Sequence, residues 1–97
     1  MALLSGYPDQ WERLGAEPDL AAGAVEETMR HLGAVRATAR VAAEDIEYRD
    51  VLFPAGTLVV TSPYVTQRDS RFWDSPDVFD PDRFSPERSA GRPRFAY

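Results

Sequence analysis

The chain has 97 residues, a net charge of −5, eleven arginines and no lysine, and it contains no cysteine. This length allows one small domain, and the acidic balance argues against partners such as nucleic acid or an acidic membrane surface. Without cysteine there is no disulfide, thiolate zinc site or thiol nucleophile, and a single histidine cannot form a histidine metal site alone. No apolar run approaches the ~20 residues of a membrane span. We therefore expect one cytoplasmic domain over residues 1–97 without a metal site, and neither a nucleic-acid nor a membrane partner.

Two helices are predicted in the first third of the chain, at about residues 8–15 and 20–32. Gly15 is a suitable end for the first helix, Asp19 a plausible N-cap for the second, and Gly33 its stop. The second helix is rich in alanine, and apolar positions follow one of its sides. These positions are Leu20, Ala24, Thr28 and Leu32, with Val25 and Met29 adjacent.

Short β-compatible runs replace the helical pattern at about residues 35–61. Residues 46–48 and 51–53 flank a turn at Arg49-Asp50, where aspartate tolerates the left-handed conformation that such turns need. A turn with proline and glycine follows, and then a β-branched strand over residues 57–60. This pattern predicts a small antiparallel region of tight hairpins.

Residues 62–97 alternate proline, aspartate and arginine with aromatic side chains. Proline excludes long regular elements, whereas the aromatic residues argue against a flexible linker. We expect a packed, irregular segment with a short helix near residues 64–68. The fold class is therefore mainly α with small antiparallel β hairpins.

Glu27 and Arg30 lie three residues apart on the second predicted helix, so their side chains are neighbours and can pair. Glu26 lies four residues before Arg30 and could take the same partner. An exposed pair of this kind contributes well under ~1 kcal/mol. Taken alone, the spacing favours a solvated surface pair.

The order of motifs along the chain changes that interpretation. The motifs are Glu27-Thr28-Met29-Arg30, Phe53-Pro54-Ala55-Gly56-Thr57, Arg68-Asp69 and Phe79-Asp80-Pro81-Asp82-Arg83-Phe84. In this order and at these spacings the series resembles the bacterial cytochromes P450, with their Glu-x-x-Arg helix, Pro-x-Gly-Thr hairpin and Pro-x-Arg-Phe motif. The resemblance covers nearly the whole chain and implies that residues 1–97 are a partial cytochrome P450 domain, a fragment of that fold.

The resemblance assigns roles to individual residues. Glu27, Arg30 and Arg83 would form a structural Glu-Arg-Arg network, in which two arginines share one carboxylate. Arg40 would contact a haem propionate, with an ordinary surface arginine at a strand end as the alternative. His31 is interpreted as a helix-end histidine favoured by the helix dipole, and not as an iron ligand.

Three further residues would lie where the family's chain passes over the haem. Val35, Ala37 and Thr38 are therefore candidate substrate contacts, with ordinary core packing as the alternative. No residue of this chain is assigned a catalytic role.

The resemblance also implies a function. The family inserts one oxygen atom from O₂ into a small organic substrate, with haem as cofactor, a cysteine thiolate on its iron and electrons from a ferredoxin or flavoprotein. The cysteine loop would follow Tyr97, and residues 1–4 would be the last turn of the long helix that precedes this region. This chain alone is therefore expected to be inactive. The alternative is a non-enzymatic module that binds a protein partner through an exposed apolar face.

Overall fold

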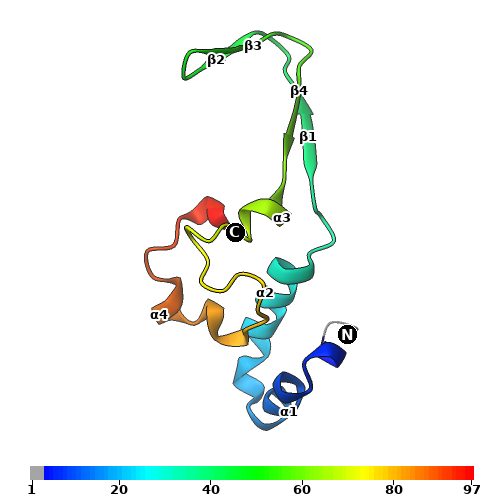
Figure 1. Cartoon of the computed structure of the whole chain (residues 1–97), viewed down its shortest axis with the longest axis vertical. Helices are drawn as coiled ribbons and strands as arrows, with labels where there is room; N and C mark the ends of the chain where they lie inside the picture. Colours follow the sequence, from blue (N-terminus) through cyan, green and yellow to red (C-terminus); the bar gives the residue numbers. More distant parts are fainter. Residues whose placement is uncertain (1–3) are drawn as a thin grey trace.

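The molecule consists of a helical part and a long β arm that projects from it (Figure 1). The structure is a computed structural model that describes residues 4–97, apart from the side chain of Phe95. Its principal extents are 54 × 29 × 19 Å, and the arm accounts for the long dimension. The helical turn expected at residues 1–4 lies outside the described residues except for Leu4, which begins the 3₁₀ turn η1 (Leu4–Gly6).

Two α-helices occupy the positions that the sequence predicts, with small differences at their ends. Helix α1 (Pro8–Ala16) continues past Gly15, because the Glu17 amide still donates to the Arg13 carbonyl at 2.9 Å. Helix α2 (Ala21–Leu32) follows a 3₁₀ turn, η2 (Pro18–Leu20). The prediction of Asp19 as N-cap is wrong, since this residue lies inside η2 and Leu20 is the N-cap of α2. The Pro18 carbonyl accepts the amide of Ala21, the first residue of α2.

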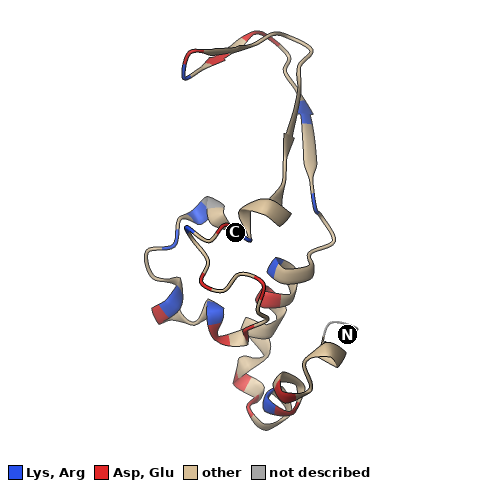
Figure 2. Ribbon diagram, in the orientation of Figure 1, with Lys and Arg blue, Asp and Glu red and all other residues tan. Residues whose placement is uncertain are grey.

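The β arm contains two separate antiparallel pairs. Strand β1 (Thr38–Val41) pairs with β4 (Leu58–Thr61), and β2 (Ile46–Tyr48) pairs with β3 (Val51–Phe53). Arg49 and Asp50 both have positive φ, 48° and 63°, so the predicted left-handed turn closes the distal hairpin. Each sheet is only two strands wide, and β4 carries no charged residue while β1 carries one, Arg40 (Figure 2).

The segment after β4 is more regular than its proline content predicts. It contains four single turns, α3 (Pro63–Thr66), η3 (Pro81–Phe84), α4 (Pro86–Ser89) and η4 (Arg94–Ala96). Proline begins three of these turns, where its missing amide is not needed. The hydroxyl groups of Ser62 and Ser85 accept backbone amides at the starts of α3 and α4.

Helix α2 turns its charged side toward this segment. Glu27 and Arg30 are 0% and 1% exposed, whereas Val25 and Met29 are 63% and 55% exposed. Leu32 is also exposed, so the apolar side predicted from the sequence is only partly buried, mainly at Ala24. The charged side is covered because residues 67–83 bring backbone carbonyls and a second arginine against it.

Apolar side chains remain open on the outer side of the two helices. Trp11, Leu14, Val25 and Met29 help to line a groove of about 390 Å³ between α1 and α2. Within residues 4–97, no helix combines the length and apolar character needed to cross a membrane.

The buried centre of the helical part is the polar contact between α2 and η3, together with Trp73 and Phe79, each 1% exposed.

Gly23 lets α2 and η3 approach each other closely. A Cβ atom at this position would lie 2.3 Å from the Pro81 carbonyl oxygen. We expect Gly23→Ala to lower the free energy of unfolding by about 1–3 kcal/mol, because the helix and the turn must separate. Urea denaturation measures this change.

Gly15→Ala is the matched control, since a Cβ there meets nothing within 4 Å. Alanine is the better helix former, so this variant should be neutral or more stable by up to ~1 kcal/mol. Equal effects of the two substitutions would contradict the close packing of α2 on η3.

Candidate functional site

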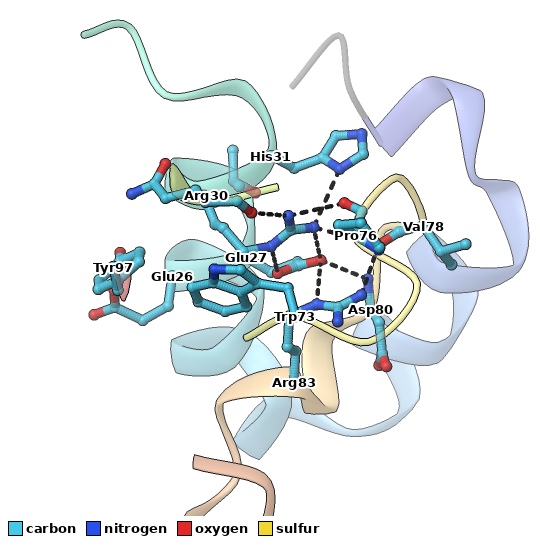
Figure 3. A network of polar contacts seen from close by, with 12 residues as sticks. Glu26, Glu27, Arg30, His31, Trp73, Pro76, Val78, Asp80, Arg83 and Tyr97 are labelled. Carbon is cyan, nitrogen blue, oxygen red and sulfur yellow. Dashed lines mark hydrogen bonds and ion pairs between the residues drawn. The ribbon is translucent and has the colours of Figure 1, made fainter. Parts of the chain in front are cut away.

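The Glu27 carboxylate is shared by two buried arginines (Figure 3). Arg30 binds it with two parallel bonds, from Nε to Oε2 at 2.7 Å and from Nη2 to Oε1 at 2.8 Å. Arg83 donates from Nε to Oε1 at 3.1 Å, and the Asp80 amide donates to the same oxygen at 3.0 Å. One carboxylate on α2 thus binds the 3₁₀ turn η3 through two separate groups.

The remaining guanidinium hydrogens bind backbone carbonyls of the loop between α3 and η3. Arg30 Nη1 donates to the carbonyls of Gln67 at 2.9 Å and Pro76 at 2.8 Å. Arg83 Nη2 donates to Val78 at 2.9 Å, and its Nη1 donates to Asp74. The loop has little regular structure of its own, so the guanidiniums donate to backbone carbonyls that would bond to amides in a helix or sheet.

The electrostatics of this cluster explain why it tolerates burial. An unpaired buried charge costs several kcal/mol, and two guanidiniums with one carboxylate leave one positive charge in excess. The carbonyl oxygens around Arg30 and Arg83 direct their negative ends at that excess charge. Charge-assisted and bidentate hydrogen bonds are stronger than neutral ones, so the cluster both stabilises the fold and sets the orientation of α2 against η3.

Two guanidiniums lie against the Trp73 ring, a contact that the sequence pattern does not indicate. The Arg30 and Arg92 guanidinium carbons lie 5.4 and 4.2 Å from its ring centroid. Its indole nitrogen donates to the carbonyls of Thr66 and Ala96, both at 3.1 Å. The only sequence signal was an aromatic residue in a segment rich in proline and aspartate.

His31 is buried beside a pair of packed aromatic rings, Tyr7 and Phe79. Its ring contacts those of Tyr7 and Phe79 edge-on, with centroids 6.3 and 6.1 Å away. Burial lowers the pKa of His31, and the positive charges of Arg30 and Arg68 lower it further. The expectation that the helix dipole favours the charged form is therefore wrong, because desolvation and two nearby cations outweigh it.

The other predicted site residues lie away from this cluster, on or just before strand β1. Arg40 is exposed opposite Val59, and its Nη1 donates to the neighbouring Ala39 carbonyl at 2.9 Å. Val35 and Ala37 are exposed among the described residues. Thr38 is half-buried and shares a 2.7 Å hydroxyl contact with Thr61.

The structure thus brings Glu27, Arg30 and Arg83 together and leaves the residues of the arm apart from them. Among the residues that the structure describes, no group of three or more histidine, cysteine, aspartate or glutamate side chains could hold a metal ion. The site is a structural polar cluster at the junction of α2 and η3.

A family model described as "Cytochrome P450" matches residues 17–97, which include the whole cluster. The chain belongs to the cytochrome P450 family. This confirms the family predicted from the order of the motifs, and with it the fold class, mainly α with small antiparallel hairpins. The described helices and strand pairs are thus part of a cytochrome P450 fold.

Individual relatives agree with this family membership. The chain is 47% identical over 76 residues to Protein AknT of Streptomyces galilaeus and 44% identical over 75 residues to luteothin monooxygenase of Streptomyces thioluteus. These matches cover 78% and 76% of this chain, but 17% and 18% of the relatives. The crystal structure of substrate-free CYP109E1 from Bacillus megaterium has a TM-score of 0.77 and 30% identity, covering 87% of this chain and 22% of that one. This chain therefore spans about a fifth of the length of the proteins that it matches.

The buried imidazole should make stability depend on pH. His31 has a lowered pKa in the folded chain, against about 6.5 in the unfolded chain. Above about pH 6.5 the imidazole is neutral in both states and stability is unaffected. As the pH falls below that value, the unfolded chain takes up the proton first, so the free energy of unfolding decreases until the pH passes through the folded pKa.

NMR titration of the imidazole measures this directly, because His31 is the only histidine in the sequence. The expected pKa lies below 6.5, and a His31→Asn variant should lose the change in stability between about pH 7 and pH 5.5. An imidazole that titrates at or above 6.5 would contradict the assigned burial.

Proposed function

We propose that this chain is the scaffold region of a haem-thiolate monooxygenase, an enzyme that inserts one oxygen atom of O₂ into a small organic substrate. The observation that carries the proposal is the buried cluster of Glu27, Arg30 and Arg83. It binds α2 to the turn η3 through charged contacts with almost no solvent exposure. Such a junction suits a region that supports a cofactor loop, because removing the Glu27 carboxylate would leave both arginines buried and unpaired.

The side chains of this region suit the edge of a haem and not its iron. Arg40 presents an exposed guanidinium on β1, a group that pairs well with the carboxylate of a haem propionate. The sequence has no cysteine to supply a thiolate, and the His31 ring is buried against Tyr7 and Phe79. Haem with a thiolate ligand supplies the activation of O₂, whereas the residues present here would orient the cofactor and the loop beside it.

Val35 and Ala37, which are exposed, and the half-buried Thr38 are the proposed substrate contacts. They precede Arg40 on the same stretch of chain. The small apolar side chains of Val35 and Ala37 suit a small organic substrate. The name of the relative luteothin monooxygenase supports this substrate class. The reaction also needs electrons, so we propose a ferredoxin or flavoprotein as the electron-transfer partner.

The alternative, a module that binds a protein partner through its exposed apolar face, has less support. The open groove between α1 and α2 agrees with either function. A chain that corresponds to about a fifth of its relatives is expected to leave open the surfaces that the rest of the fold covers. The groove therefore does not favour a separate binding function.

Haem titration followed by the spectrum of the reduced carbon monoxide complex tests the proposal. For the 97-residue chain alone we expect no thiolate-type Soret band, because the sequence contains no cysteine. The appearance of that band would overturn the assignment of the iron ligand to a region outside these residues.

A chimera gives the positive arm of this test. Residues 17–97 would replace the matching segment of luteothin monooxygenase, which keeps its own haem ligand. We expect the thiolate-type band and retained haem in this chimera, and weaker haem retention by roughly tenfold in its Arg40→Ala variant, because an exposed charge-assisted contact is lost. Arg49→Ala, at the distal turn, is the matched control. Equal haem retention in the two variants would contradict the propionate role of Arg40.

A further inference from the structure

The last residues of the chain pack against Trp73 and Phe84, beside the cluster. Ala96 is 2% exposed, and its carbonyl accepts the indole N–H of Trp73 at 3.1 Å. The Tyr97 ring contacts Trp73 and Phe84, with centroids 6.3 and 5.0 Å away. Arg92 stacks on the same Trp73 ring and donates to backbone carbonyls of the preceding turns.

A second point of attachment lies at the Tyr97 hydroxyl, which donates to Oε2 of Glu26 on α2 (Figure 3). Glu26 precedes Glu27 directly, so adjacent carboxylates of one helix bind two different parts of the chain. Glu27 binds Arg83, and Glu26 binds Tyr97. Arg30 and Arg83 are already engaged by Glu27, and a phenol satisfies Glu26 without adding another cation.

Two attachment points constrain this segment more than one does. The bond from Trp73 to the Ala96 carbonyl fixes where the backbone passes. The bond from Tyr97 to Glu26 adds an attachment to α2 itself, one residue further along the chain. Burial raises the pKa of the Tyr97 phenol, and the Glu26 carboxylate raises it further, so the hydroxyl keeps the proton that it donates.

We propose that Glu26 and Tyr97 form a latch that fixes the direction in which the chain passes Tyr97, and that both are positioning residues. The geometry of the latch is independent of any cofactor. Its consequence rests on the proposed function: a fixed direction at Tyr97 would place the haem-ligand loop that is expected to follow.

Local hydrogen exchange in the 97-residue chain tests the latch. The Ala96 amide donates to the Pro93 carbonyl at 3.0 Å and reports on the order of η4. We expect Tyr97→Phe to speed exchange of this amide about fivefold, because the ring contacts remain and only the charge-assisted bond is lost. Amides of α2 should keep their exchange rates. A change that spreads equally to α2 would show a general loss of structure and would overturn the latch.

A double-mutant cycle separates the latch from two unrelated contacts. Glu26→Ala should have the effect of Tyr97→Phe, and the double variant should exchange no faster than either one. Glu26→Gln keeps an acceptor and should have a smaller effect than Glu26→Ala. Glu47→Ala and Tyr48→Phe, on the distal hairpin, are the matched controls and should leave Ala96 unchanged. Additive effects, or an Ala96 amide that already exchanges freely in the parent chain, would overturn the proposal.

Ultraviolet titration of the tyrosines adds a signature that a purely structural role would not give. The difference between the parent chain and Tyr97→Phe isolates the Tyr97 phenol, which should ionise above the usual value of about 10. Glu26→Gln should lower this pKa. An unperturbed phenol would contradict the latch while leaving the proposed function standing, since that function is tested by the haem spectrum.

Discussion

The Glu27 carboxylate, held between the guanidiniums of Arg30 and Arg83, is the interaction on which the helical part depends. It joins α2 to η3, and the same two arginines bind the carbonyls of the loop that connects α3 to η3. A loop without its own backbone ladder needs such external donors before it can be buried. Breaking the cluster would release both the turn and the loop, because each is bound through the same guanidiniums.

This polar centre also explains the distribution of apolar surface. Helix α2 is bound through its charged side, so Val25 and Met29 remain on its outer side and line the groove with α1. The β arm is two strands wide and likewise leaves apolar side chains exposed. A small chain buries a limited fraction of its surface. Open surfaces are therefore consistent with a region that spans about a fifth of its relatives.

Local signals in the sequence predicted the elements better than their orientation. The turn at Arg49-Asp50 and the stop after Leu32 depend on a few neighbouring residues, and both were predicted correctly. The buried side of α2 depends on contacts 37 to 56 residues away in the sequence, which the spacing of Glu27 and Arg30 does not reveal. The order of the motifs suggested the cluster through the family resemblance. Neither signal indicated a role for Trp73, which depends on its contacts with the Arg92 guanidinium and the Ala96 carbonyl.

A double-mutant cycle on Glu27 and Arg83, followed by urea denaturation, tests the central claim most directly. Glu27→Gln leaves two buried guanidiniums without their shared carboxylate, so it should be strongly destabilising, by about 3–5 kcal/mol. Arg83→Gln leaves Glu27 paired with Arg30 but removes the donor to the Asp74 and Val78 carbonyls, so it should also be destabilising. We expect a coupling free energy of about 2 kcal/mol or more between the two positions, against nearly zero for the exposed pair of Arg13 and Glu17. Additivity within about 0.5 kcal/mol would contradict the claim that this shared carboxylate holds the helical part together.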